Sequence, residues 1–400
     1  MFWNIIVLKE LKYVIIKINK EMNQLERKIL FTRKDTKVAK GMAIVLMLIH
    51  HLWTFPDRLP NGNLAMTGPL TTMSINGVPI LIAFGRFGKI CVSIFMFFVG
   101  YGLYKQYISG RLNLAKRITS IYFSYWKIFI LFIPIAFIFF GNQEALTRYS
   151  DLYRHFDLQT FILNFWGINV TAYNGEWWFV MAFVIACLVG YIYIVLTKNI
   201  NDLTIEMGLV FLLNLFVINF LPELVQLPVF ESLKGEIYYE KFFNQTGIMT
   251  LFSGITFAKY NVLDQLMSKL AQIKNWGKWL LSIGGVLSAI YLLNFSGFEF
   301  YYFVLTPVLV ALLVSVINTS KILTTVFIFL GQHSTNMWLV HSFFCYRFSI
   351  FVKLVFISRN PIINLLVLIL LSLGTSIAID YFYNKIEKLK DKYHLRIMID

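Results

Sequence analysis

Charged residues are scarce in this chain. They make up 14% of its 400 residues, whereas 58% are hydrophobic and 17% are aromatic. A soluble domain of this size could not bury so much apolar surface, and apolar runs near 20 residues, the length that spans a bilayer as a helix, recur along the chain. The composition therefore excludes a soluble globular protein and predicts an all-α, polytopic membrane protein.

Cysteines and the usual catalytic motifs are scarce as well. The three cysteines, Cys91, Cys187 and Cys345, all lie in apolar segments and have neither disulfide nor metal-ligand spacing. The sequence contains no phosphate-binding glycine loop, no Gly-x-Ser-x-Gly elbow and no zinc spacing. We therefore expect no bound metal and no permanently bound cofactor.

The apolar runs predict about ten transmembrane helices. A stretch of about 20 apolar residues satisfies all of its backbone hydrogen bonds within the bilayer when it is helical. The helices are expected at 40–55, 88–107, 118–140, 177–197, 203–221, 244–260, 277–294, 300–318, 333–357 and 362–384.

The formal charge of +15 follows this topology. With a cytoplasmic N-terminus, the connections on that side and the helix ends beside them hold 25 of the 36 Lys and Arg residues, the opposite side holds 8, and three lie within helices. This asymmetry is the one that the positive-inside rule describes. An even number of helices places both termini in the cytoplasm. The positive charge is then explained by its position beside the anionic inner leaflet, and it does not indicate nucleic-acid binding.

Three segments are predicted along the chain. Residues 1–37 are too charged to span a membrane and are expected to form a basic cytoplasmic or interfacial segment, unless the start codon is assigned too early. Residues 38–384 form the transmembrane domain, and 385–400 form a basic cytoplasmic tail. The longer connections fall outside, where loops of this kind suit the capture of a polar, extended ligand.

The first predicted helix carries a lysine and a pair of histidines. Lys40 and His51 are eleven residues apart, which places them about 20° apart around a helix and ~16.5 Å apart along it. His50 is rotated about 80° from that line. Ionisable groups within an apolar helix are candidates for function; alternatively, Lys40 is a cytoplasmic flanking residue and the histidines lie at the lipid interface.

Two further pairs of cations stand out. Arg86 and Lys89 lie on the outer side, where positive charge is otherwise sparse. Lys116 and Arg117 precede an aromatic cluster at the inner face, and such a combination suits a cofactor that carries phosphates and an adenine. Topogenic charges beside an aromatic belt are the alternative for this second pair.

Polar groups also open two later helices. Glu176 and Trp177 begin the fourth; the carboxylate suits a buried cation or a hydroxyl-rich acceptor, and the indole suits a sugar ring, unless Glu176 is a solvated interfacial carboxylate. His333 and His341 lie in the ninth. Helix-to-helix hydrogen bonding accounts for His333, whereas for His341 substrate binding and this structural role both stay open.

The order of these motifs resembles the membrane-bound acyltransferase 3 family, bacterial inner-membrane enzymes that acylate exported glycans. The similarity covers roughly residues 35–385. The first motif is a cation followed by Gly, with ten residues between the cation and a histidine. The second is a Phe-rich run that ends in Ser-Gly, and the third is Arg-x-x-Arg-Ile-x-Pro-x-Tyr. The fourth is Gly-x-x-Ser followed by Tyr-Leu-x-His. They stand here as Lys40–Gly41 with His51, Phe95 to Gly100, Arg117 to Tyr125, and Gly331, Ser334, Leu339 and His341. The chain departs from the family pattern at four positions: Val99 replaces the serine, Ser120 the second arginine, Phe123 the proline and Trp338 the tyrosine.

This resemblance implies an O-acyltransferase. The acyl donor would be acetyl-CoA on the cytoplasmic side, and the acceptor would be a hydroxyl of an exported polysaccharide or of a lipid-linked glycan. His51 would act as the base or carry the acyl group. Lys40, Lys116 and Arg117 would bind CoA phosphates, although a cation is also suited to stabilising negative charge on the thioester oxygen. Arg86, Glu176, Trp177 and His341 would contact the acceptor.

A transporter or flippase for a lipid-linked glycan is the rival interpretation. Ten helices and aromatic outer loops fit such a protein. The sequence shows no matching halves, which many transporters have. The motif of the first helix also favours the acyltransferase.

Overall fold

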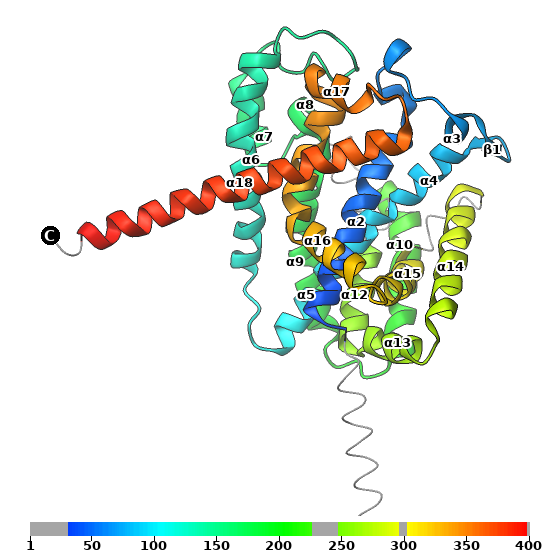
Figure 1. Ribbon diagram of the computed structural model, residues 1–400. Helices are drawn as coiled ribbons and strands as arrows, with labels where there is room; N and C mark the ends of the chain where they lie inside the picture. The colour runs from blue at the N-terminus through cyan, green and yellow to red at the C-terminus, as the bar shows by residue number, and fades with distance from the viewer. Residues whose placement is uncertain (1–30, 226–246, 296–301, 398–400) are drawn as a thin grey trace, which may run out of the picture.

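The computed structural model of the protein describes residues 31–225, 247–295 and 302–397, which form a bundle of helices (Figure 1). The two strands of the described part, β1 (Ser74–Ile75) and β2 (Val78–Pro79), make one short antiparallel hairpin in which Ser74 pairs with Pro79. The all-α class is therefore confirmed. The predicted interfacial helix near the N-terminus and most of the predicted outer loop 222–243 lie outside the described residues.

Within the described residues, each of the ten predicted transmembrane segments overlaps with helix. The long helices are α2 (Arg33–Trp53), α5 (Ile90–Ile108), α6 (Leu114–Phe140), α9 (Phe179–Thr197), α10 (Leu203–Val225), α12 (Gly247–Lys259), α14 (Asn275–Phe295), α15 (Tyr302–Ile317), α16 (Lys321–Ser342) and α18 (Pro361–Ile397). Shorter helices connect them: α3 (Pro69–Thr72), α4 (Ile80–Gly88), α7 (Leu158–Phe165), α8 (Thr171–Asn174), α13 (Val262–Ala271) and α17 (Ser349–Phe356). The remaining turns are η1 (Pro56–Arg58), η2 (Gly62–Leu64), η3 (Gly175–Trp178) and the π-helical η7 (Phe343–Arg347).

Five helical segments of the described part are long and apolar enough to cross a membrane, or six if the broken segment α16–η7–α17 is one span. Two predicted spans coincide with shorter apolar helices, Leu203–Val217 and Tyr302–Ile317. The chain is thus a polytopic membrane protein, and the total of ten crossings stays a prediction.

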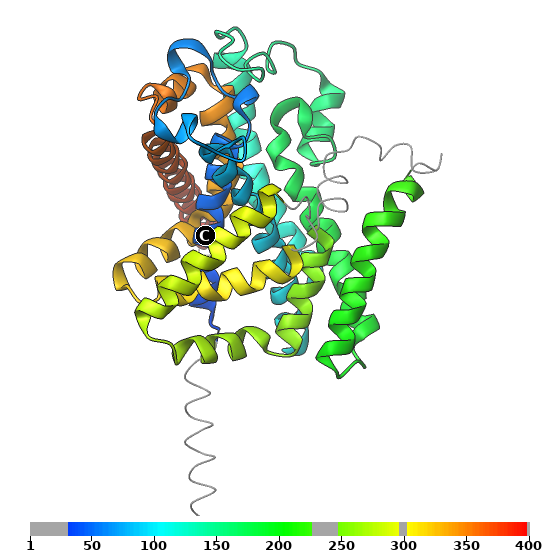
Figure 2. The same ribbon diagram turned by 90° about the vertical axis from the view of Figure 1, so that its right-hand side faces the viewer.

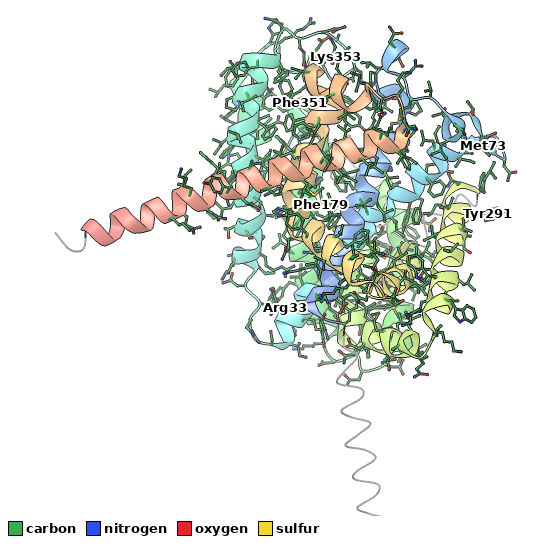
Figure 3. The ribbon with its side chains drawn as sticks, viewed as in Figure 1. Arg33, Met73, Phe179, Tyr291, Phe351 and Lys353 are labelled. Carbon is green, nitrogen blue, oxygen red and sulfur yellow. The ribbon has the colours of Figure 1, made fainter. Side chains whose placement is uncertain are left out.

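The connections predicted for each side of the membrane gather at opposite ends of the bundle. The start of α2, the connection between α5 and α6, and α13 lie together at one end, whereas the segment from α2 to α4 and the connection between α6 and α7 lie at the other (Figure 1). Arg33 and Lys353 mark these opposite ends in Figure 3. Many large apolar side chains are exposed on the outside of the bundle, such as Tyr291, which is 60% exposed. A lipid environment accounts for such surfaces.

Glycines let two pairs of helices cross at very short range. A Cβ atom at Gly331 of α16 would lie 1.9 Å from the carbonyl oxygen of Lys37 in α2, and one at Gly41 would lie 2.0 Å from that of Phe327. Gly100 of α5 and Gly254 of α12 have the same reciprocal relationship, with 2.1 Å to the backbone of the facing helix. Small residues permit such close approach of helices.

A buried ion pair joins α10, which lies at one edge of the bundle (Figure 2), to α12. Nζ of Lys259 lies 2.6 Å from Oε2 of Glu206, and the side chains are 9% and 0% exposed. The hydroxyl of Tyr260 donates to the same carboxylate oxygen at 3.0 Å, and Lys259 also donates to the carbonyl of Thr197 at 2.7 Å. These contacts satisfy the buried charges that join α10 to α12.

The ninth predicted helix, expected to be continuous over 333–357, is broken. α16 begins earlier, at Lys321, and ends at Ser342; after η7 the chain turns by 88° into α17. Arg347 lies in this break and is 1% exposed. Its Nε donates to the carbonyl of Tyr173 at 3.0 Å and its Nη1 to that of Ser342 at 3.4 Å. A buried cation needs hydrogen-bond acceptors such as these. In a continuous helix, the backbone carbonyls near Arg347 would accept from the helix itself.

The last helix crosses the bundle at a steep angle, and its C-terminal part extends away from the other helices (Figure 1). α18 continues through residue 384, where the transmembrane domain was expected to end, as far as Ile397. The boundary between domain and tail therefore stays a prediction.

Candidate active site

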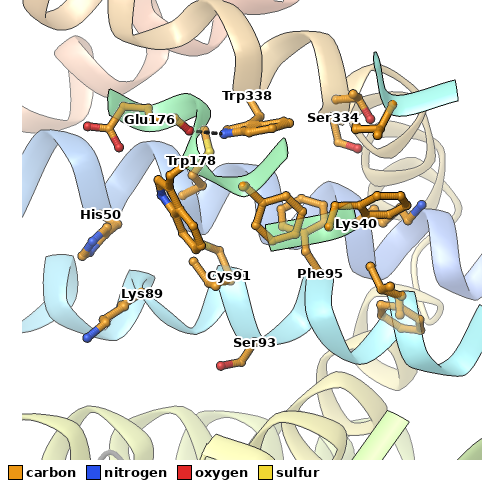
Figure 4. Close-up of a pocket in the computed structure, with 18 of the residues that line it drawn as sticks. Lys40, His50, Lys89, Cys91, Ser93, Phe95, Glu176, Trp178, Ser334 and Trp338 are labelled. Carbon is orange, nitrogen blue, oxygen red and sulfur yellow. Dashed lines mark hydrogen bonds between the residues drawn. The ribbon is translucent and has the colours of Figure 1, made fainter. Parts of the chain in front are cut away.

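A cavity of about 490 Å³ runs between α2, α5, α6, α9 and α16. Figure 4 shows His50, Lys89 and Glu176 toward one end and Lys40 toward the other, with Trp178, Trp338 and Phe95 between them. Lys89 precedes α5 and Gln106 lies in its last turn. Both line the cavity, so its two ends are separated by roughly 25 Å along the helix.

His51 and Glu176 meet at the outer end of the cavity. Nε2 of His51 lies 3.4 Å from Oε2 of Glu176, and the two side chains are 11% and 12% exposed. The other carboxylate oxygen lies 3.5 Å from Nη1 of Arg58. An imidazole beside a carboxylate is oriented by it and is stabilised when it takes up a proton. The arrangement suits a general base.

His50 faces a different set of partners. Its Nδ1 lies 2.9 Å from the carbonyl oxygen of Gly85 in α4 and 3.0 Å from Oγ1 of Thr54. A carbonyl only accepts, so Nδ1 of His50 carries the proton. The difference in rotation expected for adjacent helical residues thus separates the two histidines, although both line the cavity.

His341 lies against His51 and away from the cavity. The ring centroids are 4.8 Å apart, and His341 is 0% exposed. Its Nδ1 lies 2.6 Å from the carbonyl oxygen of Trp338, so Nδ1 is the donor. His341 therefore contacts the imidazole of His51, and its contact with substrate stays a prediction.

The segment 338–347 fixes both parts of the His–Glu pair. On the side of Glu176, the indole of Trp338 donates to the carbonyl of Glu176 at 3.0 Å. Trp177 donates to the carbonyl of Leu339 at 2.9 Å. On the side of His51, the hydroxyl of Tyr346 donates to the carbonyl of His51. One broken helix thus places a turn at residue 176 beside the end of α2.

Besides His341, two more predicted acceptor-binding residues, Arg86 and Trp177, do not line the cavity. Trp177 is 0% exposed and packs on Tyr125, with ring centroids 5.0 Å apart. Its neighbour Trp178 lines the cavity instead. Arg86 lies exposed at the end of α4, and Lys89, one turn later, lines the cavity. Trp177 and Trp178 are adjacent in η3, and the packing of the surrounding helices decides which of the two lines the cavity.

The inner end of the cavity is rich in cations. Its lining includes Lys40, Arg111, Lys116 and Arg117. Arg117 donates from Nη1 to Oε1 of Gln106 at 2.8 Å and from Nη2 to the carbonyl of Val99 at 3.4 Å, so its guanidinium is held in place. Such an end suits a phosphate-bearing ligand.

Sequence reasoning missed Arg58 and Arg111. Arg58 lies in η1, seven residues beyond His51, and its guanidinium lies 3.9 Å from the ring centroid of Phe55. Positive charge is scarce on the outer side, and this scarcity could have identified Arg58 as a candidate site residue. Within the ranges described, no group of three or more His, Cys, Asp or Glu side chains is arranged to hold a metal ion.

Comparison with protein-family models matches residues 35–381 to Acyl_transf_3, described as an acyltransferase domain. Comparison with curated proteins and with solved structures finds no match.

Proposed function

Because the chain belongs to the acyltransferase 3 family, we propose that it transfers an acyl group, most simply acetyl, from CoA to a hydroxyl of an exported glycan. Its place would be the bacterial cytoplasmic membrane, with the donor on the cytoplasmic side and the glycan on the outer side. The observation that carries the proposal is the continuous cavity that joins the cation-rich end to the His51–Glu176 pair.

The donor would lie along the cavity with its phosphates at the inner end. Lys116 and Arg117 would bind them, together with Lys40, which is ~16.5 Å from His51 along α2 and so too far to act on the same atoms. The aromatic side chains between the two ends, among them Phe95 and Phe179, would flank the uncharged arm of CoA. The thioester would then reach the outer end.

The chemistry would take place at His51. The imidazole takes the proton from the glycan hydroxyl as its oxygen attacks the thioester carbon. The carbon–sulfur bond breaks, and the proton passes to the sulfur of CoA. Glu176 orients the imidazole and offsets the charge that it acquires. Transfer through an acyl group carried on His51 would use the same residues in two steps.

CoA release by the purified protein tests this proposal. The protein, reconstituted with acetyl-CoA, receives polysaccharide extracted from the cells that express it, and free thiol is followed over time. We expect release that depends on the polysaccharide and is lost in His51→Ala. Release that is absent, while the protein moves a lipid-linked glycan across the bilayer, would favour the transporter.

A further inference from the structure

Tyr346 is one of the largest side chains that are fully buried, and it lies in η7 beside the candidate base. Its hydroxyl donates to the carbonyl oxygen of His51, and its ring centroid lies 6.1 Å from that of His51. The two residues are 295 positions apart in the chain. The contact therefore ties the break after α16 to the last turn of α2.

The carbonyl of His51 lies in the last turn of α2. The last four carbonyls of a helix have no partner within it, and α2 ends at Trp53. The carbonyl of His50 accepts from the backbone of Thr54 at 3.1 Å. For the next residue, His51, the hydroxyl of Tyr346 supplies a donor. Tyr346 thus caps the turn that carries the imidazole.

The backbone of Tyr346 is itself held from the outer side. The hydroxyl of Thr147 donates to the carbonyl of Tyr346, and Gln143 donates to that of Arg347. Oε1 of Gln143 accepts from the backbone of Ser349 at 2.7 Å. These contacts support the break where a continuous helix would have supplied its own hydrogen bonds.

We propose that Tyr346 is a positioning residue, whose hydroxyl sets the imidazole of His51 against Glu176 for acyl transfer. This inference rests on the proposed function. A misplacement of about 1 Å at a reacting group can cost roughly 10²-fold in rate. The hydroxyl therefore acts on turnover through His51, while the binding of the donor, at the other end of the cavity, is left unchanged.

Tyr346→Phe tests the proposal, with Tyr153→Phe as the matched control. Tyr153 is also buried, and its hydroxyl also donates to a backbone carbonyl, that of Tyr173, at 2.8 Å. We expect Tyr346→Phe to lower kcat by roughly 10–10²-fold with an unchanged KM for acetyl-CoA. Tyr153→Phe should lower the thermal midpoint by a similar amount and keep its kcat.

Equal kcat values for the two variants would overturn the proposal, provided that the wild type releases CoA. A wild type without activity would contradict the proposed function instead. If Tyr346→Phe does not fold, Thr147→Val, which removes the hydroxyl on the Tyr346 backbone, serves as the second variant. It should lower kcat in the same direction by less, and an unchanged kcat there would count against the proposal.

Discussion

Nε2 of His51 lies 3.4 Å from Oε2 of Glu176, although 125 residues separate the two in the chain. His51 belongs to the last turn of α2, and Glu176 belongs to the turn η3. Trp338 holds the backbone of Glu176, and Tyr346 holds that of His51. The end of α16 and the break that follows it therefore hold His51 and Glu176 beside each other.

Glu176→Gln should lower acyl transfer by about 10² to 10⁴-fold, because an amide of the same shape cannot offset the charge that His51 acquires. CoA release at saturating acetyl-CoA measures the effect. Glu144→Gln is the control, since Glu144 is 61% exposed and pairs with Lys353 at the surface. Full activity in Glu176→Gln would mean that His51 works without this carboxylate.

The positions of the helices could be predicted from the sequence because long apolar runs have few alternatives in a bilayer. The sequence also identified two of the glycines at the helix crossings. Gly41 and Gly331 stand in motifs that were singled out from the sequence, and the structure gives the physical reason, which is the crossing of α2 and α16.

The break in the ninth helix could not be predicted, because its cause lies far away in the chain. Arg347 is bound by the carbonyl of Tyr173, 174 positions earlier. Nor could the sequence tell which tryptophan of the pair at 177 and 178 faces the cavity. That choice depends on the packing of Trp177 against Tyr125 and Phe343, with centroids 5.0 and 5.7 Å away.

Arg117→Ala should raise the KM for acetyl-CoA roughly tenfold or more, because one charge-assisted hydrogen bond to a phosphate is lost. The maximal rate should change less. Lys116→Ala should act in the same direction, and Lys105→Ala, which removes a cation bonded to Asn261 outside the cavity lining, is the control. An unchanged KM for acetyl-CoA in both variants would mean that Lys116 and Arg117 only set the orientation of the helix in the membrane.

Reporter fusions after Lys198 and after Asp400 should read cytoplasmic, and one after Arg148 should read external. The charge asymmetry of 25 to 8 is the reason. Arg148 lies in the loop at the outer end, where it pairs with Asp57 at 2.9 Å. A C-terminal reporter that reads external would contradict the even number of crossings.

Gly331→Ala should destabilise the protein by about 1–3 kcal/mol, because the new methyl group meets the backbone of α2 and must push the two helices apart. Its Cβ atom would lie 1.9 Å from the carbonyl oxygen of Lys37. The thermal midpoint in detergent measures the change. Gly374→Ala is the control, since a Cβ atom at that position would meet no other described atom within 4 Å, and equal midpoints for the two variants would disprove the close crossing.

His51→Ala should nearly abolish acyl transfer, whereas His50→Ala should keep substantial activity. A catalytic base typically contributes about 10²–10⁴-fold, and His51 is the histidine that faces Glu176. His50 donates to the carbonyl of Gly85, a role in the packing of α2 against α4. Alkali-labile acyl esters on the cell's glycans measure the activity, and membrane expression of both variants should stay normal. The opposite pair of phenotypes would assign the base to His50, and normal acylation in both variants would remove the imidazole from the mechanism.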